Sequence, residues 1–327
     1  MEDSSPKEDN PGVLKLLEAL KQAIQELQAH PTHKSVQSNS SPIKALLELE
    51  TESFLTRRVS TYSISRVAGS IESEIQALMD RGSIDSLINA LKDPWKDEDE
   101  LARLLSQFEH RVSQGFNPEL QDSVLKSKAF SVLQTVLCDP NCSKQIREKA
   151  AFCVAALIRF NKDVFVGQVN MGDTIQALLE MKSAHSVKVL CELITFIKSP
   201  FVDVILCNGE LPKILTLLES KDLSMKVVVF NCILEIGYFG RKEAVEAMLN
   251  GGLIEKLVEL QRSEFGENHP FASCVARFAV QLEVGEGLRK REKRAFKPEI
   301  LEKVREASVN DAEAATIIAE VLWGSSP

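Results

Sequence analysis

The chain contains the stretch Gly82-Ser-Ile-Asp-Ser-Leu-Ile-Asn-Ala-Leu91, which returns as Gly209-Glu-Leu-Pro-Lys-Ile-Leu-Thr-Leu-Leu218 and as Gly252-Leu-Ile-Glu-Lys-Leu-Val-Glu-Leu260. In each copy a glycine is followed by an aliphatic residue two positions later and by two more at five and six positions. Apolar residues spaced in this way lie on one face of an α-helix. Each copy therefore predicts a helix that begins near its glycine and buries one side.

Weaker copies of the pattern lie between the first and the second copy. One starts at Ser127, with Ala129, Val132 and Leu133 at the same offsets, and a looser one starts at Gly172. Successive starts are 37 to 45 residues apart, and such a period is typical of stacked helical repeats. We therefore expect an all-α protein, a right-handed α-solenoid.

The composition limits the classes of function. The chain has 327 residues, of which 44% are hydrophobic and 26% charged, as in a folded globular protein. Its net charge of −8 and its pI of 5.4 argue against general nucleic-acid binding, which needs a basic face. An acidic balance suits a basic protein partner, and it is also a common way to remain soluble.

The sequence predicts a cytoplasmic or nuclear location. Its seven cysteines are scattered singly along apolar segments, as expected of reduced, buried thiols. The N-terminal residues 1–9 lack the basic and apolar regions of a secretory signal. The longest apolar run, residues 150–158, is half the length of a membrane span, so we expect no membrane association.

Four segments are expected along the chain. Residues 1–41 have the composition of a disordered linker with one amphipathic helix. Residues 42–80 are predicted to form an N-terminal helical extension, and residues 81–285 to contain the repeats. Residues 286–327 are predicted to hold a basic segment and a C-terminal helix that caps the last apolar face of the solenoid.

Three segments are predicted to form helices that line a concave groove. Residues 186–197, 225–236 and 271–282 are apolar around most of the helix circumference and leave one narrow polar strip. Such a helix must be buried between neighbours on both sides, so only the strip faces outwards. The strips contain the candidate groove contacts Lys188, Glu192, Asn231, Glu235, Arg277 and Gln281.

These features resemble the armadillo repeat. After the glycine-led helix comes a nearly wholly apolar one, as in Lys149-Ala-Ala-Phe-Cys-Val-Ala-Ala-Leu-Ile158 and Lys226-Val-Val-Val-Phe-Asn-Cys-Ile-Leu234. The overall style is similar to plant armadillo-repeat proteins, including those that carry the repeats behind a U-box, although no U-box pattern precedes Gly82. The resemblance implies a surface that binds protein partners.

The resemblance does not extend to the residues with which armadillo proteins hold extended basic peptides. Those proteins present Trp and Asn at fixed places on the groove helix. Here Trp95 and Trp323 lie outside the predicted groove helices, and only Asn231 approaches the Asn place.

The chain carries no recognisable catalytic or cofactor motif. It lacks the Gly-x-Gly-x-x-Gly and Gly-x-x-x-x-Gly-Lys-[Ser/Thr] phosphate loops and the His-Glu-x-x-His zinc motif. Cys138-Asp-Pro-Asn-Cys142 has no second Cys or His pair at zinc-site spacing, which favours a turn with two incidental thiols over a metal site. We expect a non-enzyme without a cofactor, a metal or a small-molecule substrate. An enzyme with a site assembled from scattered residues is the less favoured alternative.

Two short motifs are candidates for regulation or docking. Arg57-Arg58-Val59-Ser60 resembles a basic-directed kinase substrate, and a phosphate on Ser60 would add nearly two negative charges beside the arginines. A chance match is the alternative. A second motif is a basic patch, which comprises Arg289, Lys290, Arg291, Lys293, Arg294 and Lys297.

The basic patch has three possible roles. It could be a nuclear localisation signal or a docking strip for an acidic surface. The alternative is a solvated face of the capping helix, paired with the groove or with Glu299, Glu302 and Glu306.

The prediction for function is a non-catalytic scaffold or adaptor that binds another protein along the concave groove. The alternative is an accessory or substrate-recognition subunit in ubiquitin ligation or chaperone cycling, which the resemblance alone suggests.

Overall fold

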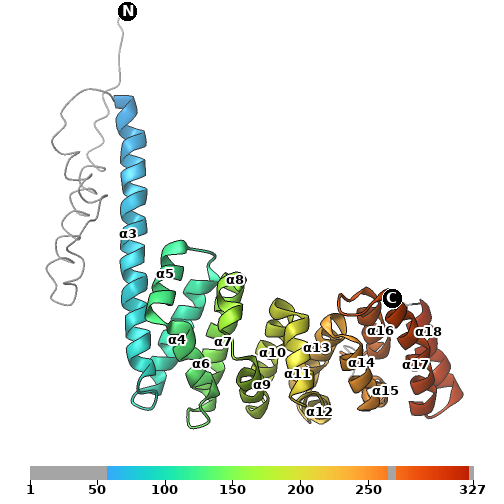
Figure 1. Ribbon diagram of the computed structural model, residues 1–327. Coiled ribbons are helices and arrows are strands. Elements are labelled where there is room, and N and C mark those ends of the chain that lie inside the picture. Colours follow the sequence, from blue (N-terminus) through green and yellow to red (C-terminus); the bar gives the residue numbers. More distant parts are fainter. Residues whose placement is uncertain (1–56, 264–269, 324–327) are drawn as a thin grey trace, which may run out of the picture. The chain divides into compact units, whose positions relative to one another are not determined.

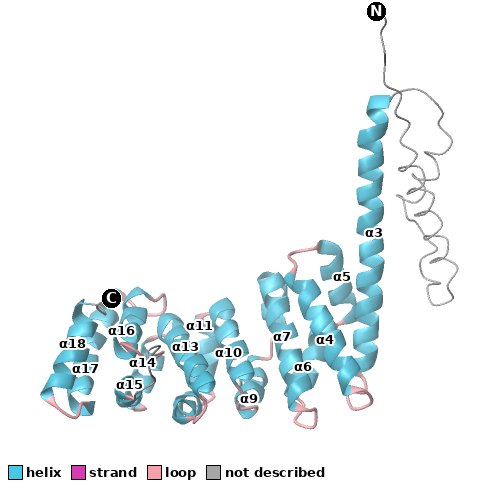
Figure 2. Ribbon diagram, turned by 180° about the vertical axis from the view of Figure 1, so that it is seen from behind, coloured by secondary structure: helices cyan, strands magenta, loops and turns pink. Residues whose placement is uncertain are grey.

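The computed structural model describes residues 57–263 and 270–323, and the chain divides into two compact units, residues 1–78 and 79–327. Of the first unit, residues 57–78 are described, and they belong to helix α3 (Arg57–Leu91). Ser60 therefore lies within a helix, whereas the helix predicted within residues 1–41 lies outside the described residues. The second unit is all-helical in its described part (Figures 1 and 2).

The second unit contains four repeats of three helices each. The first comprises α5 (Pro118–Ser127), α6 (Ala129–Cys138) and α7 (Lys144–Phe160). The second comprises α8 (Lys162–Phe165) with the 3-10 turn η2 (Val166–Gln168), α9 (Met171–Glu180) and α10 (Ala184–Ile197). The third comprises α11 (Ser199–Cys207), α12 (Leu211–Thr216) with the 3-10 turn η3 (Leu217–Glu219), and α13 (Leu223–Phe239). The fourth comprises α14 (Lys242–Asn250), α15 (Leu253–Arg262) and α16 (Cys274–Val284).

At each end of the described array, the stack is extended by two helices that correspond to the second and third helices of a repeat. At one end, α4 (Glu98–Ser113) follows the last turns of α3 and packs against α7. At the other end, α17 (Lys290–Ala307) packs against α15, and α18 (Asp311–Trp323) packs against α16. The two C-terminal helices thus occupy the places of a second and a third helix.

The third helices form a continuous row. Helix α10 packs between α7 and α13, and α16 packs between α13 and α18. Figure 1 shows these helices side by side in chain order. The nearly wholly apolar segments of the sequence all fall on this row, because a helix with a neighbour on either side must be apolar around most of its circumference.

The glycine-led pattern falls on the second helix of each repeat and on the corresponding last turns of α3. Its copies lie in the last turns of α3 and in α6, α9, α12 and α15. At least one aliphatic residue of each copy has at most 1% of its surface exposed, as Leu87, Leu133, Leu178, Ile214 and Leu257 show. The pattern therefore marks the face by which each second helix enters the core.

The glycines of the pattern have a backbone role at two corners. Gly209 (φ 68°) and Gly252 (φ 76°) turn the chain from a first helix into a second one, in the left-handed region that glycine adopts without strain. At the same corner of the first repeat, Lys128 takes φ 56°. A glycine is therefore the favoured residue at this corner, although it is not obligatory.

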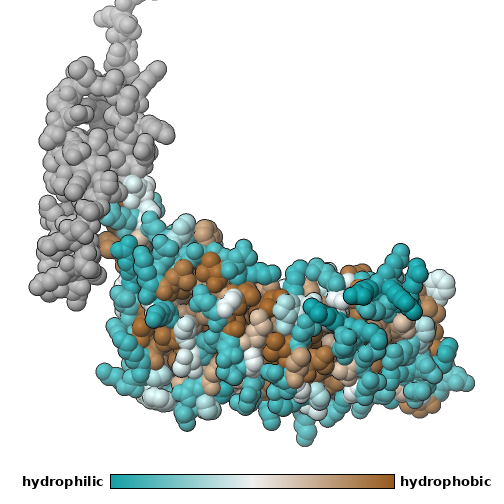
Figure 3. Space-filling model, in the orientation of Figure 1, coloured by the Kyte–Doolittle hydropathy of each residue, from teal (hydrophilic) through white to brown (hydrophobic). Residues whose placement is uncertain are grey.

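A single hydrophobic core runs through the second unit. Its buried residues extend from Ile84 to Val321 without interruption between repeats. Ring pairs join successive repeats: Phe130 stacks on Phe165 with centroids 5.5 Å apart, and Phe230 meets Phe271 edge to face at 6.0 Å. In Figure 3, hydrophobic side chains also reach the surface in patches along the middle of the face in view, between hydrophilic margins.

Candidate partner-binding face

The six predicted groove residues lie on three neighbouring helices of the row. Lys188 and Glu192 belong to α10, Asn231 and Glu235 to α13, and Arg277 and Gln281 to α16. Lys188, Asn231 and Arg277 are exposed and the other three are half-buried. We call the exposed and half-buried side chains along α7, α10, α13 and α16 the third-helix face.

An ion pair connects α7 with α10 on this face. Nη2 of Arg159 lies 2.9 Å from Oε2 of Glu192, and the Arg159 guanidinium lies 5.9 Å from the centre of the Phe196 ring. The half-buried Glu192 carboxylate is therefore held in one orientation. Sequence reasoning missed Arg159, although it lies one residue beyond the apolar run of α7.

A hydrogen bond connects α10 with α13. The Thr195 hydroxyl is 3.2 Å from Oε2 of Glu235 and 3.0 Å from the carbonyl oxygen of Cys191. Because a hydroxyl has one proton, it donates to one of these oxygens at a time. The half-buried carboxylate of Glu235 on α13 thus has a hydrogen-bond donor on the neighbouring helix α10.

A cation–π contact connects α13 with α16. The guanidinium of Arg277 lies 4.7 Å from the centre of the Phe230 ring, and its Nη1 donates to the carbonyl oxygen of Pro270 at 3.0 Å. At the other end of the row, Nζ of Lys149 on α7 donates to the hydroxyl of Ser106 on α4 at 2.7 Å. Adjacent third helices from α4 to α16 are thus joined by side-chain contacts near the surface.

The third-helix face carries both signs of charge. Its six predicted residues comprise two cations, two carboxylates and two amides. Since Glu192, Glu235 and Arg277 already have partners on the protein, little side-chain freedom remains to be lost when a ligand binds. The face can therefore offer ordered donors and acceptors, spaced one repeat apart.

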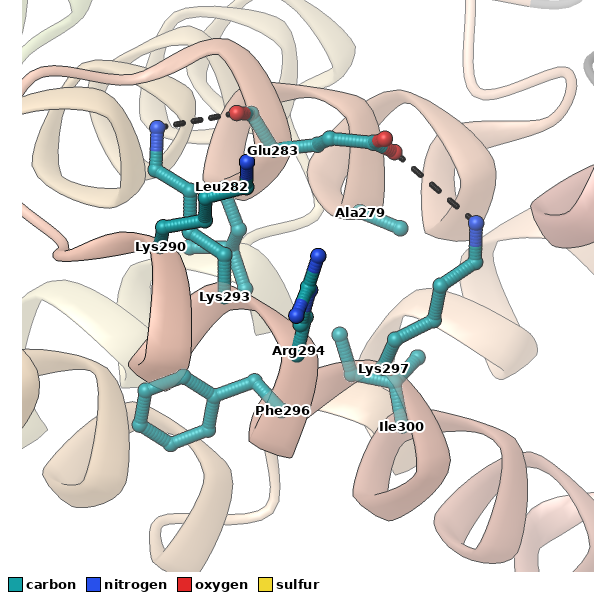
Figure 4. Close-up of a pocket in the computed structure, with 9 residues that line it drawn as sticks. All are labelled: Ala279, Leu282, Glu283, Lys290, Lys293, Arg294, Phe296, Lys297 and Ile300. Carbon is teal, nitrogen blue, oxygen red and sulfur yellow. Dashed lines mark hydrogen bonds and ion pairs between the residues drawn. The ribbon is translucent and has the colours of Figure 1, made fainter.

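The basic patch is divided by the structure. Lys290, Lys293, Arg294 and Lys297 line a pocket of about 540 Å³ between α16 and α17, whereas Arg289 and Arg291 do not (Figure 4). Among the described residues, Glu299, Glu302 and Glu306 form no ion pair with the patch. The ion pair that the described residues do form with the patch joins Oε2 of Glu283 to Nζ of Lys297, 3.8 Å apart.

Four of the seven cysteine side chains, Cys138, Cys142, Cys191 and Cys274, are poorly placed for chemistry. Burial raises the pKa of the Cys138 and Cys142 thiols, and it raises the pKa of Cys191 and of Cys274 to about 12. A thiol with a raised pKa is protonated at neutral pH and is a weak nucleophile or metal ligand. In the described part of the chain, His, Cys, Asp and Glu form no group of three or more that could hold a metal ion.

Comparisons with solved structures place this architecture among known folds. A designed armadillo repeat protein is 17% identical, with a TM-score of 0.50 over 72% of this chain and 98% of its own. Another designed armadillo repeat protein, solved in complex with the peptide (KR)4, is 17% identical with a TM-score of 0.51 over the same shares. An engineered protein, 16% identical, matches 94% of this chain and 67% of its own with a TM-score of 0.54.

The fold is a right-handed α-solenoid of armadillo type. No protein-family model and no curated protein matches the sequence. Among the residues described, no helix combines the length and the apolar character needed to cross a membrane.

The last helix of the described chain also lies in the row of third helices. Trp323 is the last residue of α18, which packs beside α16. Trp323 thus lies outside the predicted groove helices α10, α13 and α16, and its side chain is 86% exposed.

Proposed function

We propose that the protein is a non-catalytic scaffold that binds an extended segment of a partner protein along the third-helix face. The observation that carries the proposal is the series of side-chain contacts between adjacent third helices. These contacts hold Glu192, Glu235 and Arg277 in place, so a bound segment would meet groups that are already oriented. The armadillo array solved with (KR)4 supports the proposal, since an array of the same fold there holds a peptide.

The charges of the face indicate the kind of segment. A purely basic peptide would meet Lys188 and Arg277 as well as the two carboxylates, and like charges that face each other weaken binding. The amides of Asn231 and Gln281 can donate to and accept from a peptide backbone. We therefore propose a partner segment of mixed charge, bound through its backbone and through alternating acidic and basic side chains.

The test is a comparison of the proteins captured from the native source. Replacement of both carboxylates, Glu192→Lys with Glu235→Lys, should remove the partners that the unmodified chain captures. The matched control is Glu243→Lys with Glu255→Lys, which makes the same change in net charge at exposed positions of α14 and α15. Retention of every partner by the first variant would contradict the proposal, provided that its melting temperature equals that of the control.

The narrower roles remain predictions. A subunit of ubiquitin ligation or chaperone cycling would be indicated if ligases or chaperones were among the partners lost from the Glu192/Glu235 variant. The cytoplasmic or nuclear location requires imaging of the tagged chain, and phosphorylation of Ser60 requires peptide mapping under kinase-activating conditions.

A further inference from the structure

The junction between α16 and α17 differs from the other junctions between repeats. After α7, α10 and α13 the chain forms a first helix, but residues 285–289 lead directly into α17. The amides of Glu286 and Gly287 donate to the carbonyl oxygen of Tyr238 at 2.8 and 3.0 Å. A Cβ atom on Gly287 would lie 2.1 Å from the carbonyl oxygen of Gly240. The connection is therefore bound tightly to the end of α13, and no first helix lies between α16 and α17.

The pocket of about 540 Å³ lies between these two helices (Figure 4). We call it the α16–α17 pocket, and its lining has two parts. The apolar part comprises Ala279 and Leu282 on α16 with Phe296 and Ile300 on α17. The charged part comprises Glu283, Lys290, Lys293, Arg294 and Lys297. Four cations and one carboxylate give the lining a net charge of +3.

The four cations share a helix face because of their spacing. Lys290, Lys293, Arg294 and Lys297 stand at positions i, i+3, i+4 and i+7, which lie above one another on an α-helix. Like charges at this spacing destabilise a helix unless something compensates them. Arg289 and Arg291 belong to the same run in the sequence but do not line the pocket.

Only part of this charge is compensated within the protein. Nζ of Lys293 donates to the carbonyl oxygens of Glu283 and Gly285 at 2.9 and 2.7 Å, at the negative end of α16. Lys297 is 3.8 Å from the Glu283 carboxylate. Lys290 and Arg294 have no acidic partner among the described residues. Figure 4 shows the Arg294 guanidinium directed into the space between the two helices, with no interaction drawn to it.

We propose that the α16–α17 pocket binds an acidic segment of a partner protein. Carboxylates of this segment pair with Arg294 and Lys290, since a guanidinium can take a carboxylate in two parallel hydrogen bonds. An aliphatic or aromatic residue of the segment, next to its carboxylates, packs against Ala279 and the rest of the apolar part of the lining. None of the six predicted groove residues lines the pocket, although its lining shares Ala279 and Glu283 of α16 with the third-helix face.

The experiment uses the full chain and two fluorescein-labelled peptides, Gly-Asp-Glu-Leu-Glu-Asp-Gly and the same sequence with Ser in place of Leu. Binding is followed by anisotropy at about 0.15 M salt, where charges more than a Debye length apart are screened. We expect the Leu peptide to bind more tightly than the Ser peptide. Arg294→Glu should weaken binding by at least about tenfold, because it replaces the cation that pairs with the peptide carboxylates by a like charge that repels them.

The matched control is Arg291→Glu, which makes the same charge change on the same helix outside the pocket. It should weaken binding by less than about threefold, as expected for a charge at the rim. Arg294→Gln, which adds no carboxylate, should lie between the two variants. Melting temperatures confirm that all variants fold, and the Glu192/Glu235 variant should retain the peptides.

Three outcomes would overturn the proposal. The first is equal weakening by Arg291→Glu and Arg294→Glu, which would assign binding to general charge. The second is absence of peptide binding to the unmodified chain at millimolar concentration. The third is tighter binding of a single-stranded oligonucleotide of equal charge, lost in Arg294→Glu, which would make the ligand a nucleic acid.

Discussion

Arg262 of α15 and Glu313 of α18 form a two-pronged pair, with Nε 2.7 Å from Oε1 and Nη2 2.9 Å from Oε2. Nη2 of Arg262 also lies 3.3 Å from the carbonyl oxygen of Ala307, at the end of α17. One guanidinium thus connects the last complete repeat with both C-terminal helices. Its hydrogen bonds, together with that from the amide of Val309, hold the pKa of Glu313 below its ordinary value.

The Arg262–Glu313 pair predicts a stability difference that depends on pH. Because the pKa of Glu313 is lower in the folded state, its contribution to stability is fully present above the unfolded pKa, about 4.3, and is lost as pH falls through the folded pKa. We expect Glu313→Gln to lower the free energy of unfolding by about 1 kcal/mol at pH 7 and by much less at pH 3. Urea unfolding at both values tests this, with Glu306→Gln as the control. An equal loss at pH 3 and pH 7 would contradict it.

The first helix pair depends on a buried carboxylate. Asp80 is 4% exposed, and its two oxygens each accept a hydrogen bond of 2.8 Å from Arg111 on α4. Removal of one partner from such a pair costs about 3 kcal/mol, because the other charge is left behind. We expect Asp80→Ala to increase hydrogen exchange in α4 far more than in α13, since each repeat is stabilised by its neighbours. Asp85→Ala, an exposed position on the same helix, should leave the exchange unchanged.

Two glycines should respond in opposite ways to alanine. A Cβ atom at Gly287 would overlap the carbonyl oxygens of Gly240 and Phe239, so Gly287→Ala should lower the free energy of unfolding by about 2 kcal/mol or more. Gly82 lies inside α3 with nothing within 4 Å of its Cβ position, so Gly82→Ala should raise stability by about 0.5–1 kcal/mol. Melting temperatures of the two variants, each compared with the unmodified chain, test both expectations. Equal shifts in the same direction would refute the assignment of Gly287 to a close approach.

The cysteines should differ sharply in reactivity. Of the seven, Cys207 is exposed, whereas Cys142, Cys153, Cys232 and Cys274 are buried. We expect iodoacetamide at pH 8 to modify Cys207 first in the folded protein, and Cys207→Ser to slow the early reaction by about tenfold. Mass spectrometry of timed samples gives the order. Early modification of Cys153 or Cys232 would show that the core opens more readily than its packing indicates.

Much of the fold could be predicted because its signals lie within one helix. The apolar spacing after Gly209 and Gly252 marks a buried helix face, and it does so whatever the neighbours are. Corners without glycine or proline gave no such signal. Lys128 and Lys182 adopt φ values of 56° and 45°, which lysine takes only where the surrounding packing imposes them.

The candidate sites were predictable only in part. The polar strips identify which residues of α10, α13 and α16 face outwards, since this depends on helical periodicity alone. The partners Arg159, Thr195 and Phe230 depend on how one repeat is offset against the next, which no local pattern contains. In the same way, the basic patch could be recognised in the sequence. Which of its residues line the pocket and which do not depends on where α16 packs, and the sequence does not show this.

The stacking order also has a consequence for biosynthesis. The helix contacts of the second unit join elements within one repeat or in adjacent repeats. An N-terminal repeat can therefore bury its core as soon as the next one has left the ribosome, without waiting for the C-terminus. Since close sequence separation also speeds folding, we expect the described repeats to mature layer by layer during translation, from α4 towards α18.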